Sequence, residues 1–309
     1  MNRFKNILVV YSQAKTANLL LRRAAALAWR NEARLTVVEA FGGFLYHMPI
    51  LISKTSPKEL NKQFAYERCE YLKEQISKII KYDIQLNVKV LIGTPFLEII
   101  RAVMREHYDL VVATSERRKG LNGHFFDRTA LHLMRKCPCP VWIMKPDQNK
   151  PFSEILAAVD PDLSNVVKHT LNIKIMDLAT SLAQQENSKL HVVHAWSPRR
   201  EHFLRYTKMS VQEVDQVTQQ LLTQRRKQLD DFVAPYAVDK QVHYLLDEPG
   251  IAIPDLVTKQ HIDLIVMGTI CRTGLAGLII GSTAENVLQQ VECSILAVKP
   301  EGFVSPVET

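Results

Sequence analysis

An internal repeat is the feature of this sequence that most constrains its fold. Residues 109–146, DLVVATSERRKGLNGHFFDRTALHLMRKCPCPVWIMKP, match residues 263–300, DLIVMGTICRTGLAGLIIGSTAENVLQQVECSILAVKP, without a gap. The 38 aligned positions share 12 identities at a constant offset of 154 residues. Self-similarity of this kind marks a duplicated structural unit. We therefore expect two domains, residues 1–148 and 149–309, joined around the polar segment DQNKPFSE.

Each copy alternates strand-like and helix-like patterns. The first copy predicts strands near 5–11, 34–41, 84–92, 108–114 and 140–145, with helices near 16–31, 59–81, 95–106 and 127–136. The second predicts strands near 153–159, 189–195, 240–246, 262–268 and 294–298, and a long helix near 210–233. Continuous apolar runs such as LTVV and DLVV are typical of parallel strands covered on both faces. The pattern predicts an α/β fold with two flavodoxin-like (Rossmann-like), doubly wound parallel sheets.

Composition limits the class of protein. With 309 residues, 47% of them hydrophobic, the chain is long enough for two ordinary domains. Polar residues interrupt every apolar run before it reaches membrane-spanning length, and the start of the chain lacks a signal-peptide pattern. Five cysteines suit a reducing compartment better than a disulfide framework. We therefore expect a cytoplasmic protein without a membrane span.

The two halves differ in charge. Residues 1–150 carry a net charge of +12 and residues 151–309 a net charge of −5. The basic half could meet an anionic partner, but its charges are scattered, which favours a solvated face. Nucleic acid is not the expected partner, because no platform of aromatic and basic residues is present.

Candidate ligand residues in the second copy follow the ends of predicted strands, where open α/β sheets bind ligands. Asp160 ends the first strand and could accept hydrogen bonds from a ribose or base, and Ala195 lies in the stretch from His194 to Trp196 that could line an adenine slot. Backbone N–H groups of a glycine-rich link before a helix can hold a phosphate. The residues at the two ends of that link are Gly268, Thr269, Gly281, Ser282 and Thr283. Ser282 and Thr283 also suit an N-cap of the next helix, which would explain their hydroxyls without a ligand.

These residues carry a family resemblance. A strand, the spacing G-x-x-G-x(9)-G-[S/T] and a helix, with aspartate ending the first strand, resemble the universal stress proteins. The duplication covers nearly the whole chain and most resembles the tandem E type of that family. The resemblance implies two domains of the adenine nucleotide alpha hydrolase type related by a pseudo-two-fold, and a regulatory stress-response role without an enzymatic activity. It also implies ATP or AMP as a ligand of the second domain, with Asp160 at the nucleoside and Gly268, Gly281 and Ser282 at the phosphates; no cofactor is obligatory.

The second copy departs from the family motif at one glycine. Cys271 stands at the middle glycine, and its side chain fills space that a phosphate would approach. Arg272 beside it could compensate as a charged phosphate donor, or it could simply be a surface residue while Cys271 packs. Both interpretations stay open, so Cys271 and Arg272 are candidate ligand residues.

The first copy departs further. Gly268, Cys271, Gly281 and Ser282 of the second copy correspond to Thr114, Arg117, Asp127 and Arg128, and Asp160 corresponds to Ser12. An acidic side chain at Asp127 would repel a phosphate. We expect the first copy to have lost nucleotide binding and to serve as a structural or interaction half.

Other patterns do not point to catalysis or to a metal. The CPCP stretch lacks partner ligands at zinc spacing, and Cys139 aligns with Cys293, which favours small buried residues. His191 and His194 are expected in the core or at its rim. The sequence has no nucleophile elbow, Walker A loop, G-x-G-x-x-G or H-E-x-x-H motif. No motif therefore supplies a nucleophile, a base or a metal for an enzymatic reaction.

Two other functions stay open. The apolar segment from Phe41 to Ile52 is expected to be covered by protein, but it could line a pocket for a lipid-like or nucleotide-sugar metabolite. The equivalent segment, Ser197 to Met209, is basic and aromatic and could face an anionic head group. If Cys271 blocks the phosphate site, the chain is instead a ligand-free scaffold for unknown protein partners. Single-domain family members pair through their last strand, so the two final strands are expected to meet within one chain, as an intramolecular pseudo-dimer or within a homodimer.

Overall fold

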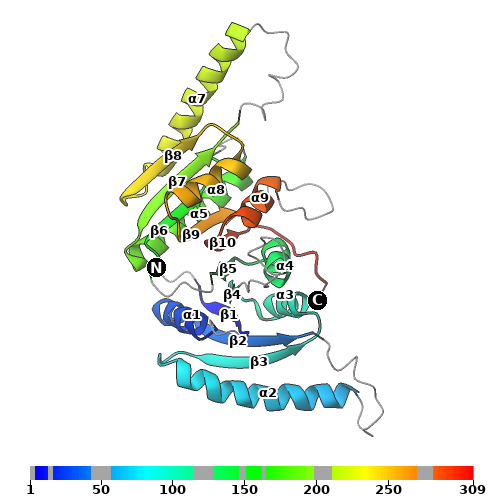
Figure 1. The fold of residues 1–309 in the computed structure, drawn as a ribbon. Helices are drawn as coiled ribbons and strands as arrows, with labels where there is room; N and C mark the ends of the chain where they lie inside the picture. The colour runs from blue at the N-terminus through cyan, green and yellow to red at the C-terminus, as the bar shows by residue number, and fades with distance from the viewer. Residues whose placement is uncertain are drawn as a thin grey trace. The chain divides into compact units, whose positions relative to one another are not determined.

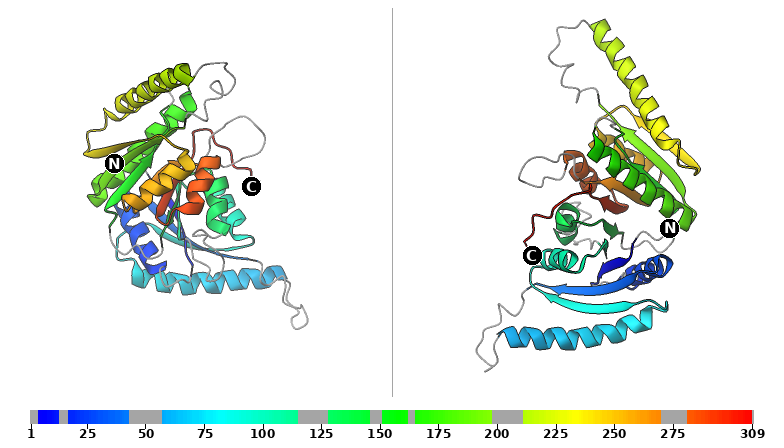
Figure 2. Two further views of the ribbon diagram at one scale, coloured as in Figure 1. Left: turned by 45° about the horizontal axis from the view of Figure 1, so that its top comes forward. Right: turned by 180° about the vertical axis from the view of Figure 1, so that it is seen from behind.

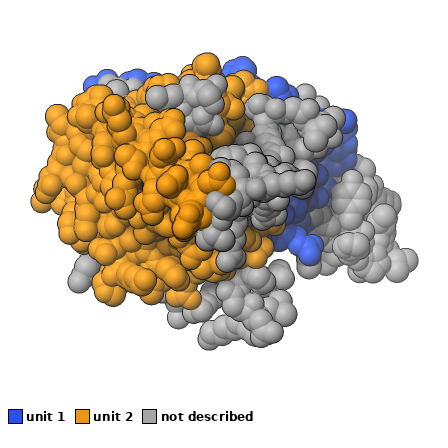
Figure 3. Space-filling view, turned by 90° about the horizontal axis from the view of Figure 1, so that it is seen from above, with its two compact units in different colours: residues 1–149, 304–309 blue, residues 150–303 orange. Residues whose placement is uncertain are grey.

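The computed structural model describes residues 4–12, 17–42, 57–114, 128–145, 151–161, 165–197, 211–269 and 281–308. The chain divides into two compact units, Met1–Asn149 with Val304–Thr309, and Lys150–Phe303 (Figure 3). The last residues therefore group with the first unit, where the Arg101 Nε donates to the Glu308 carbonyl at 3.0 Å. The predicted pairing of the two final strands and the pseudo-two-fold stay predictions.

The first unit alternates strands and helices throughout. Its elements are β1 (Asn6–Val10), α1 (Ala17–Asn31), β2 (Arg34–Phe41), α2 (Pro57–Ile79), β3 (Leu86–Ile92), α3 (Pro95–Glu106), β4 (Leu110–Thr114), α4 (Arg128–Lys136) and β5 (Val141–Met144) (Figure 1). All strands are parallel, in the order β3-β2-β1-β4-β5. The order reverses between β1 and β4, as in a doubly wound sheet.

The second unit repeats this plan. Its elements are β6 (Glu154–Ala158), α5 (Val166–Glu186), β7 (Lys189–Ala195), α7 (Val211–Val233), β8 (Lys240–Leu245), α8 (Pro249–Lys259), β9 (Leu264–Gly268), α9 (Ser282–Gln290) and β10 (Ser294–Val298). The parallel strands follow the order β8-β7-β6-β9-β10, the same order as in the first unit. The α/β fold with two doubly wound parallel sheets, predicted from the sequence, is confirmed.

Helices cover both faces of the sheet in the second unit (Figure 2). The ring of His169 on α5 meets Phe232 on α7 edge-on, so these two helices lie together on one face. The helices α8 and α9 pack against each other on the other face, where Gly250 of α8 lies directly against Asn286 of α9. Because both faces are covered, the residues of β10 are all buried, and so are the central residues of β6 and the first four of β9.

A repeated aspartate explains part of the sequence identity between the copies. The Asp109 carboxylate accepts from the backbone N–H groups of Lys5 at 2.6 Å and Asn6 at 3.1 Å. At the offset of 154, the Asp263 carboxylate accepts from Ser153 at 2.7 Å and Glu154 at 3.1 Å. In both units the carboxylate therefore satisfies backbone donors at the beginning of the central strand, which would otherwise lack partners.

Candidate functional site

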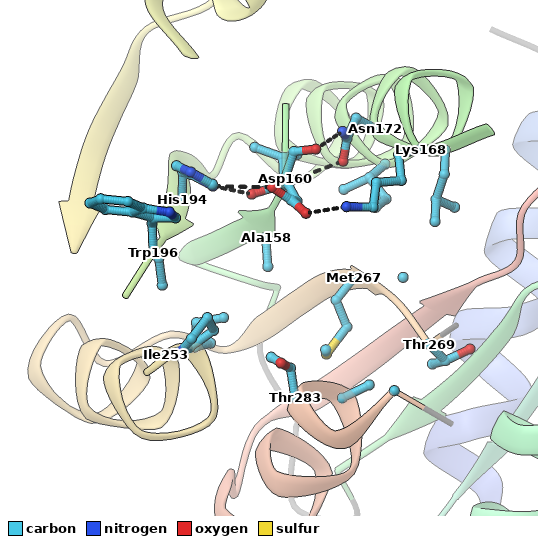
Figure 4. Close-up of a pocket in the computed structure, with 18 of the residues that line it drawn as sticks. Ala158, Asp160, Lys168, Asn172, His194, Trp196, Ile253, Met267, Thr269 and Thr283 are labelled. Atoms are coloured by element: carbon cyan, nitrogen blue, oxygen red, sulfur yellow. Dashed lines mark hydrogen bonds and ion pairs between the residues drawn. The ribbon is translucent and has the colours of Figure 1, made fainter. Parts of the chain in front are cut away.

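The second unit contains a cavity of about 210 Å³ beyond the carboxyl ends of β6, β7 and β9. The chain runs from β6 outward to β8 in one direction and through β9 to β10 in the other, so the cavity lies at the topological switch point. Six of the candidate residues line it: Asp160, Ala195, Gly268, Thr269, Gly281 and Thr283. Figure 4 shows Asp160 and Thr283 on opposite walls of the cavity.

A side chain on α5 fixes the backbone of Asp160. The Asn172 Oδ1 accepts from the Asp160 N–H at 3.1 Å, and its Nδ2 donates to the Asp160 carbonyl at 2.6 Å. Asn172 is buried, so its amide has little competition from water. This pair of hydrogen bonds sets the direction in which the Asp160 carboxylate leaves the end of β6.

The Asp160 carboxylate lies between a cation and a histidine (Figure 4). Its Oδ2 accepts from the Lys168 Nζ at 3.1 Å, and its Oδ1 lies 3.9 Å from the His194 Nδ1. Just over half of the side chain, 54%, is exposed, so a hydroxyl of a ligand can reach it. The ion pair is partly exposed and contributes little to stability.

His194 forms a neutral wall of the cavity. Its Nδ1 lies 3.2 Å from the carbonyl oxygen of Val159, and because a carbonyl only accepts, this nitrogen carries the proton. Burial lowers the pKa of His194, and the neighbouring Asp160 carboxylate acts in the opposite direction. The ring is therefore uncharged at neutral pH. His191, on the same strand, is fully buried, so the expected core placement of both histidines is confirmed.

The two ends of the glycine-rich link lie next to each other. The Gly281 N–H donates to the Thr269 carbonyl at 3.1 Å, which joins the two ends of the link. The Thr269 side chain is fully buried, and its hydroxyl accepts from the Lys299 ammonium group. Cys271 and Arg272 lie outside the described residues, so their predicted roles stay predictions.

The start of α9 differs from the prediction. Gly281 is the N-cap and Ser282 is already the first helical residue, so the expected N-cap at Ser282 or Thr283 was wrong. The reason is that the Gly281 carbonyl accepts the first helical hydrogen bond, from the Glu285 N–H at 3.0 Å. Gly281, Thr283 and Ala284 all line the cavity, so the N-terminal turn of α9 lies at its edge.

Gly268 has a packing reason to be glycine. A methyl group added there would lie 2.8 Å from the Cδ2 of Leu171 on α5. The absence of a side chain therefore lets α5 approach the end of β9 closely. Gly268 also lines the cavity, so packing and ligand access both depend on it.

Sequence reasoning missed the contribution of the helices. Lys168, Asn172 and the apolar residues Leu171 and Ile175 come from α5, and Ile253 comes from α8. The spacing of Lys168 and Asn172 by four residues, directly after the strand that ends at Asp160, was the available signal, since residues four apart share one helix face.

The first unit has a cavity at the equivalent place, of about 430 Å³. Ser12 and Thr114, the counterparts of Asp160 and Gly268, line it together with Glu39. Glu39 is buried and accepts two hydrogen bonds from Arg68, at 2.7 and 3.0 Å. In the aligned segments VVEAF and VVHAW, Glu39 stands where the second unit has His194, so a buried carboxylate paired with a half-buried arginine replaces the neutral histidine.

The side chains near the CPCP stretch are packed in the core. Cys137, Cys139 and Cys293 are buried, as expected for Cys139 and its counterpart. The Sγ atoms of Cys137 and Cys139 lie 3.5 Å apart, and burial raises the pKa of the Cys139 thiol well above its usual range. Within the described residues, no group of three or more metal-binding side chains gathers, and none of the helices is long and apolar enough to cross a bilayer.

Comparisons with known proteins agree with this architecture. The model of the universal stress protein family matches residues 3–145 and 152–299. The chain is 27% identical over 320 residues to universal stress protein E of Photorhabdus laumondii, covering 100% of this chain and 99% of the relative. It is 26% identical over 313 residues to universal stress protein E of Escherichia coli K12, covering 100% and 98%. A solved structure of a functionally unknown protein from Pseudomonas aeruginosa PAO1 aligns with a TM-score of 0.72 and 22% identity over 97% of this chain and 94% of that one, which shows the shared fold. The chain therefore belongs to the universal stress protein family and carries two of its domains in tandem.

Proposed function

We propose that the second unit binds an adenine nucleotide, ATP or AMP, in the cavity at the ends of β6, β7 and β9. One observation carries this proposal: the cavity brings an accessible carboxylate and the start of a helix to opposite walls. The Asp160 carboxylate accepts hydrogen bonds from ribose hydroxyls. The N-terminal turn of α9 supplies backbone N–H groups and a partial positive charge for phosphate.

The remaining walls suit a nucleobase. Most of the residues between the two polar ends are apolar, including Ile175, Ile253 and Met267. A planar base gains free energy when it leaves water for such a surface. The neutral ring of His194 adds a polar group without a charge, which suits an uncharged base.

The chemistry of the cavity supports binding and regulation rather than catalysis. Asp160 is ion-paired with Lys168, and His194 is held by the Val159 carbonyl. General acid–base catalysis needs a group whose proton is free to move to a substrate atom. We propose a regulatory protein of the stress response in the cytoplasm, which binds its ligand without turning it over.

A ligand screen tests this proposal. Thermal shift and native mass spectrometry of the freshly purified full chain would be run with ATP, AMP, UDP-sugars and fatty acids. A ligand at about a hundred times its Kd stabilises the folded state by about 2.7 kcal/mol. We expect this stabilisation with ATP or AMP.

Matched variants assign the binding to the second unit. Asp160→Ala should remove the shift, whereas Ser12→Ala, at the equivalent position of the first unit, should leave it unchanged. Cys271→Gly restores the family glycine and should tighten phosphate binding. If neither the native chain nor Cys271→Gly responds to ATP or AMP, the nucleotide proposal is wrong. A shift with fatty acids or UDP-sugars alone would identify a metabolite binder, and no shift at all would favour a protein scaffold.

A further inference from the structure

Three titratable side chains form a hydrogen-bonded row across the second unit, on strands β6, β7 and β8. The His191 Nε2 lies 2.6 Å from the Glu154 Oε2, and the His191 Nδ1 lies 2.9 Å from the His243 Nε2. The two rings are stacked, with centroids 5.2 Å apart and planes inclined by 15°. We call Glu154, His191 and His243 the histidine row.

The face of the sheet that carries the row is covered by α8, whose buried residues are apolar. His191 is fully buried, whereas Glu154 and His243 are partly exposed. Successive residues of a strand point to opposite faces, and Tyr244 faces α7, so His243 points to the face that α8 covers. The charged residues of α8, Asp255 and Lys259, are exposed, and its buried residues carry no charged or polar side chain.

Two charged groups of the described residues lie close to the row: the Asp263 carboxylate, which accepts from the Glu154 N–H at 3.1 Å, and Lys189. Lys189 lies on β7 two residues before His191, and it lowers the pKa of His243 together with His191. Burial is the largest cause of that lowering. The Glu154 carboxylate is therefore the anion that the row uses to hold a proton.

Counting protons shows that the row accepts one extra proton but not two. With both rings neutral, the His191 Nε2–H donates to Glu154, and the His243 Nε2–H donates to the bare His191 Nδ1. With one extra proton, His191 donates from both nitrogens, and His243 accepts. With two extra protons, an N–H of His191 faces an N–H of His243, so the hydrogen bond is lost and two cations remain in contact.

The strand that carries His243 lies at the edge of its sheet. β8 is the edge strand of the second unit and pairs with β7 alone. Its Tyr244 hydroxyl donates to Asp230 on α7, and Arg226 of α7 lies over the Tyr244 ring. At its end, the Leu245 carbonyl accepts from the Trp196 N–H at 2.9 Å, and Trp196 lines the cavity. β8 therefore connects the row to α7 and to the cavity wall.

The first unit lacks this arrangement. The register that pairs His243 with Val193 in the second unit pairs Lys89 with Val38 in the first. Lys89 forms an ion pair with Glu106, so no histidine stands at this position of the first unit. The edge strand β3 is thus an internal reference for β8.

We propose that the histidine row is a pH-sensitive latch that holds β8 against β7 near neutral pH and releases it in acid, when extra protons on the row break the hydrogen bond between His243 and His191. Because the pKa of His243 is lowered in the folded state, the unfolded chain binds more protons as the pH falls below the usual histidine value near 6.5. The stabilisation by the row is therefore present at neutral pH and is lost on acidification. The latch acts whether or not the cavity binds a nucleotide.

Hydrogen exchange measured by mass spectrometry tests the latch in the full chain. Exchange would be followed from pH 7.5 to 5.0 and corrected for the intrinsic pH dependence of amide exchange. We expect peptides covering β8 to lose protection below about pH 6.5, while peptides covering β3 keep theirs. Trp196 fluorescence should change over the same range.

Two variants complete the test. His243→Gln keeps an N–H donor for His191 but cannot titrate, so β8 should stay protected in acid. His261→Asn is the matched control: His261 is an exposed histidine of the same unit with φ of 51°, a conformation that asparagine tolerates. This control should behave like the native chain. Unchanged protection of β8 down to pH 5.0 in the native chain would refute the latch even if His243→Gln failed to fold, and so would equal acid sensitivity in His243→Gln.

Discussion

Replacing Asn172 by alanine removes the two hydrogen bonds that hold the backbone of Asp160 at the end of β6. A buried hydrogen bond contributes about 1 kcal/mol net, so the pair contributes roughly 2 kcal/mol. Alanine is the better helix former by about 0.5 kcal/mol, which offsets part of the loss. We therefore expect Asn172→Ala to lower the free energy of unfolding by about 1.5 kcal/mol.

Urea unfolding followed by circular dichroism and tryptophan fluorescence measures this change. The transition of the second unit should move to lower urea while its slope stays unchanged, since the surface exposed on unfolding is the same. Ligand affinity should fall as well, because the Asp160 carboxylate is no longer held toward the cavity.

Two further variants on α5 separate the hydrogen bonds from other effects. Asn172→Asp keeps an acceptor for the Asp160 N–H but directs an anion at its carbonyl, so it should be at least as destabilising as alanine. Thr170→Ala removes only a solvent-exposed hydrogen bond within the helix, so its effect should stay within about 0.5 kcal/mol. Stability of Asn172→Ala equal to that of the native chain would refute the reasoning that this amide fixes the site.

Arg68→Ala leaves the buried Glu39 carboxylate without its arginine partner and should lower the free energy of unfolding in urea by about 3–5 kcal/mol. The double variant with Glu39→Leu should recover most of that loss. Equal losses in both variants would contradict this account. Burial raises the pKa of Tyr108 and of Tyr244 to about 12, so the stability that their protonated forms contribute is present below pH 10 and is lost as the pH rises through about 12. Absorbance at alkaline pH should show a group of tyrosines that titrates late and is smaller by one in Tyr244→Phe, and a native chain whose tyrosines all ionise near pH 10 would rule this out. Gly268→Ala should cost about 1 kcal/mol in thermal unfolding, because its methyl group meets a leucine of α5, and a fully neutral effect would mean that this helix moves freely.

Much of the fold could be predicted because it depends on local patterns. The bounds predicted for each strand agree with the structure to within about two residues, the inner strands were recognised by their apolar runs, and the repeat gave the same order of elements twice. The reason is that strands buried on both faces need apolar residues at every position, whatever their neighbours are.

Helix ends were harder to predict. Asn187 and His261 both adopt left-handed backbone conformations after α5 and α8, with φ of 56° and 51°. Helix ends of this kind are usually signalled by glycine, and neither residue is one. At the start of α9 the hydroxyl residues looked like the N-cap, but the glycine before them takes that position.

The sequence by itself determined that the chain is a duplicated α/β protein and that Asp160, Gly268 and Gly281 belong at one edge of the sheet, because strand ends and repeat offsets are readable along the chain. Only the tertiary structure decided which groups surround them. Lys168 and Asn172 reach Asp160 from a helix that packs over the strand ends, and the histidine row joins strands whose members are up to 89 positions apart, from 154 to 243. Side-chain contacts of this kind depend on the register of parallel strands and on helix packing, which no local pattern encodes.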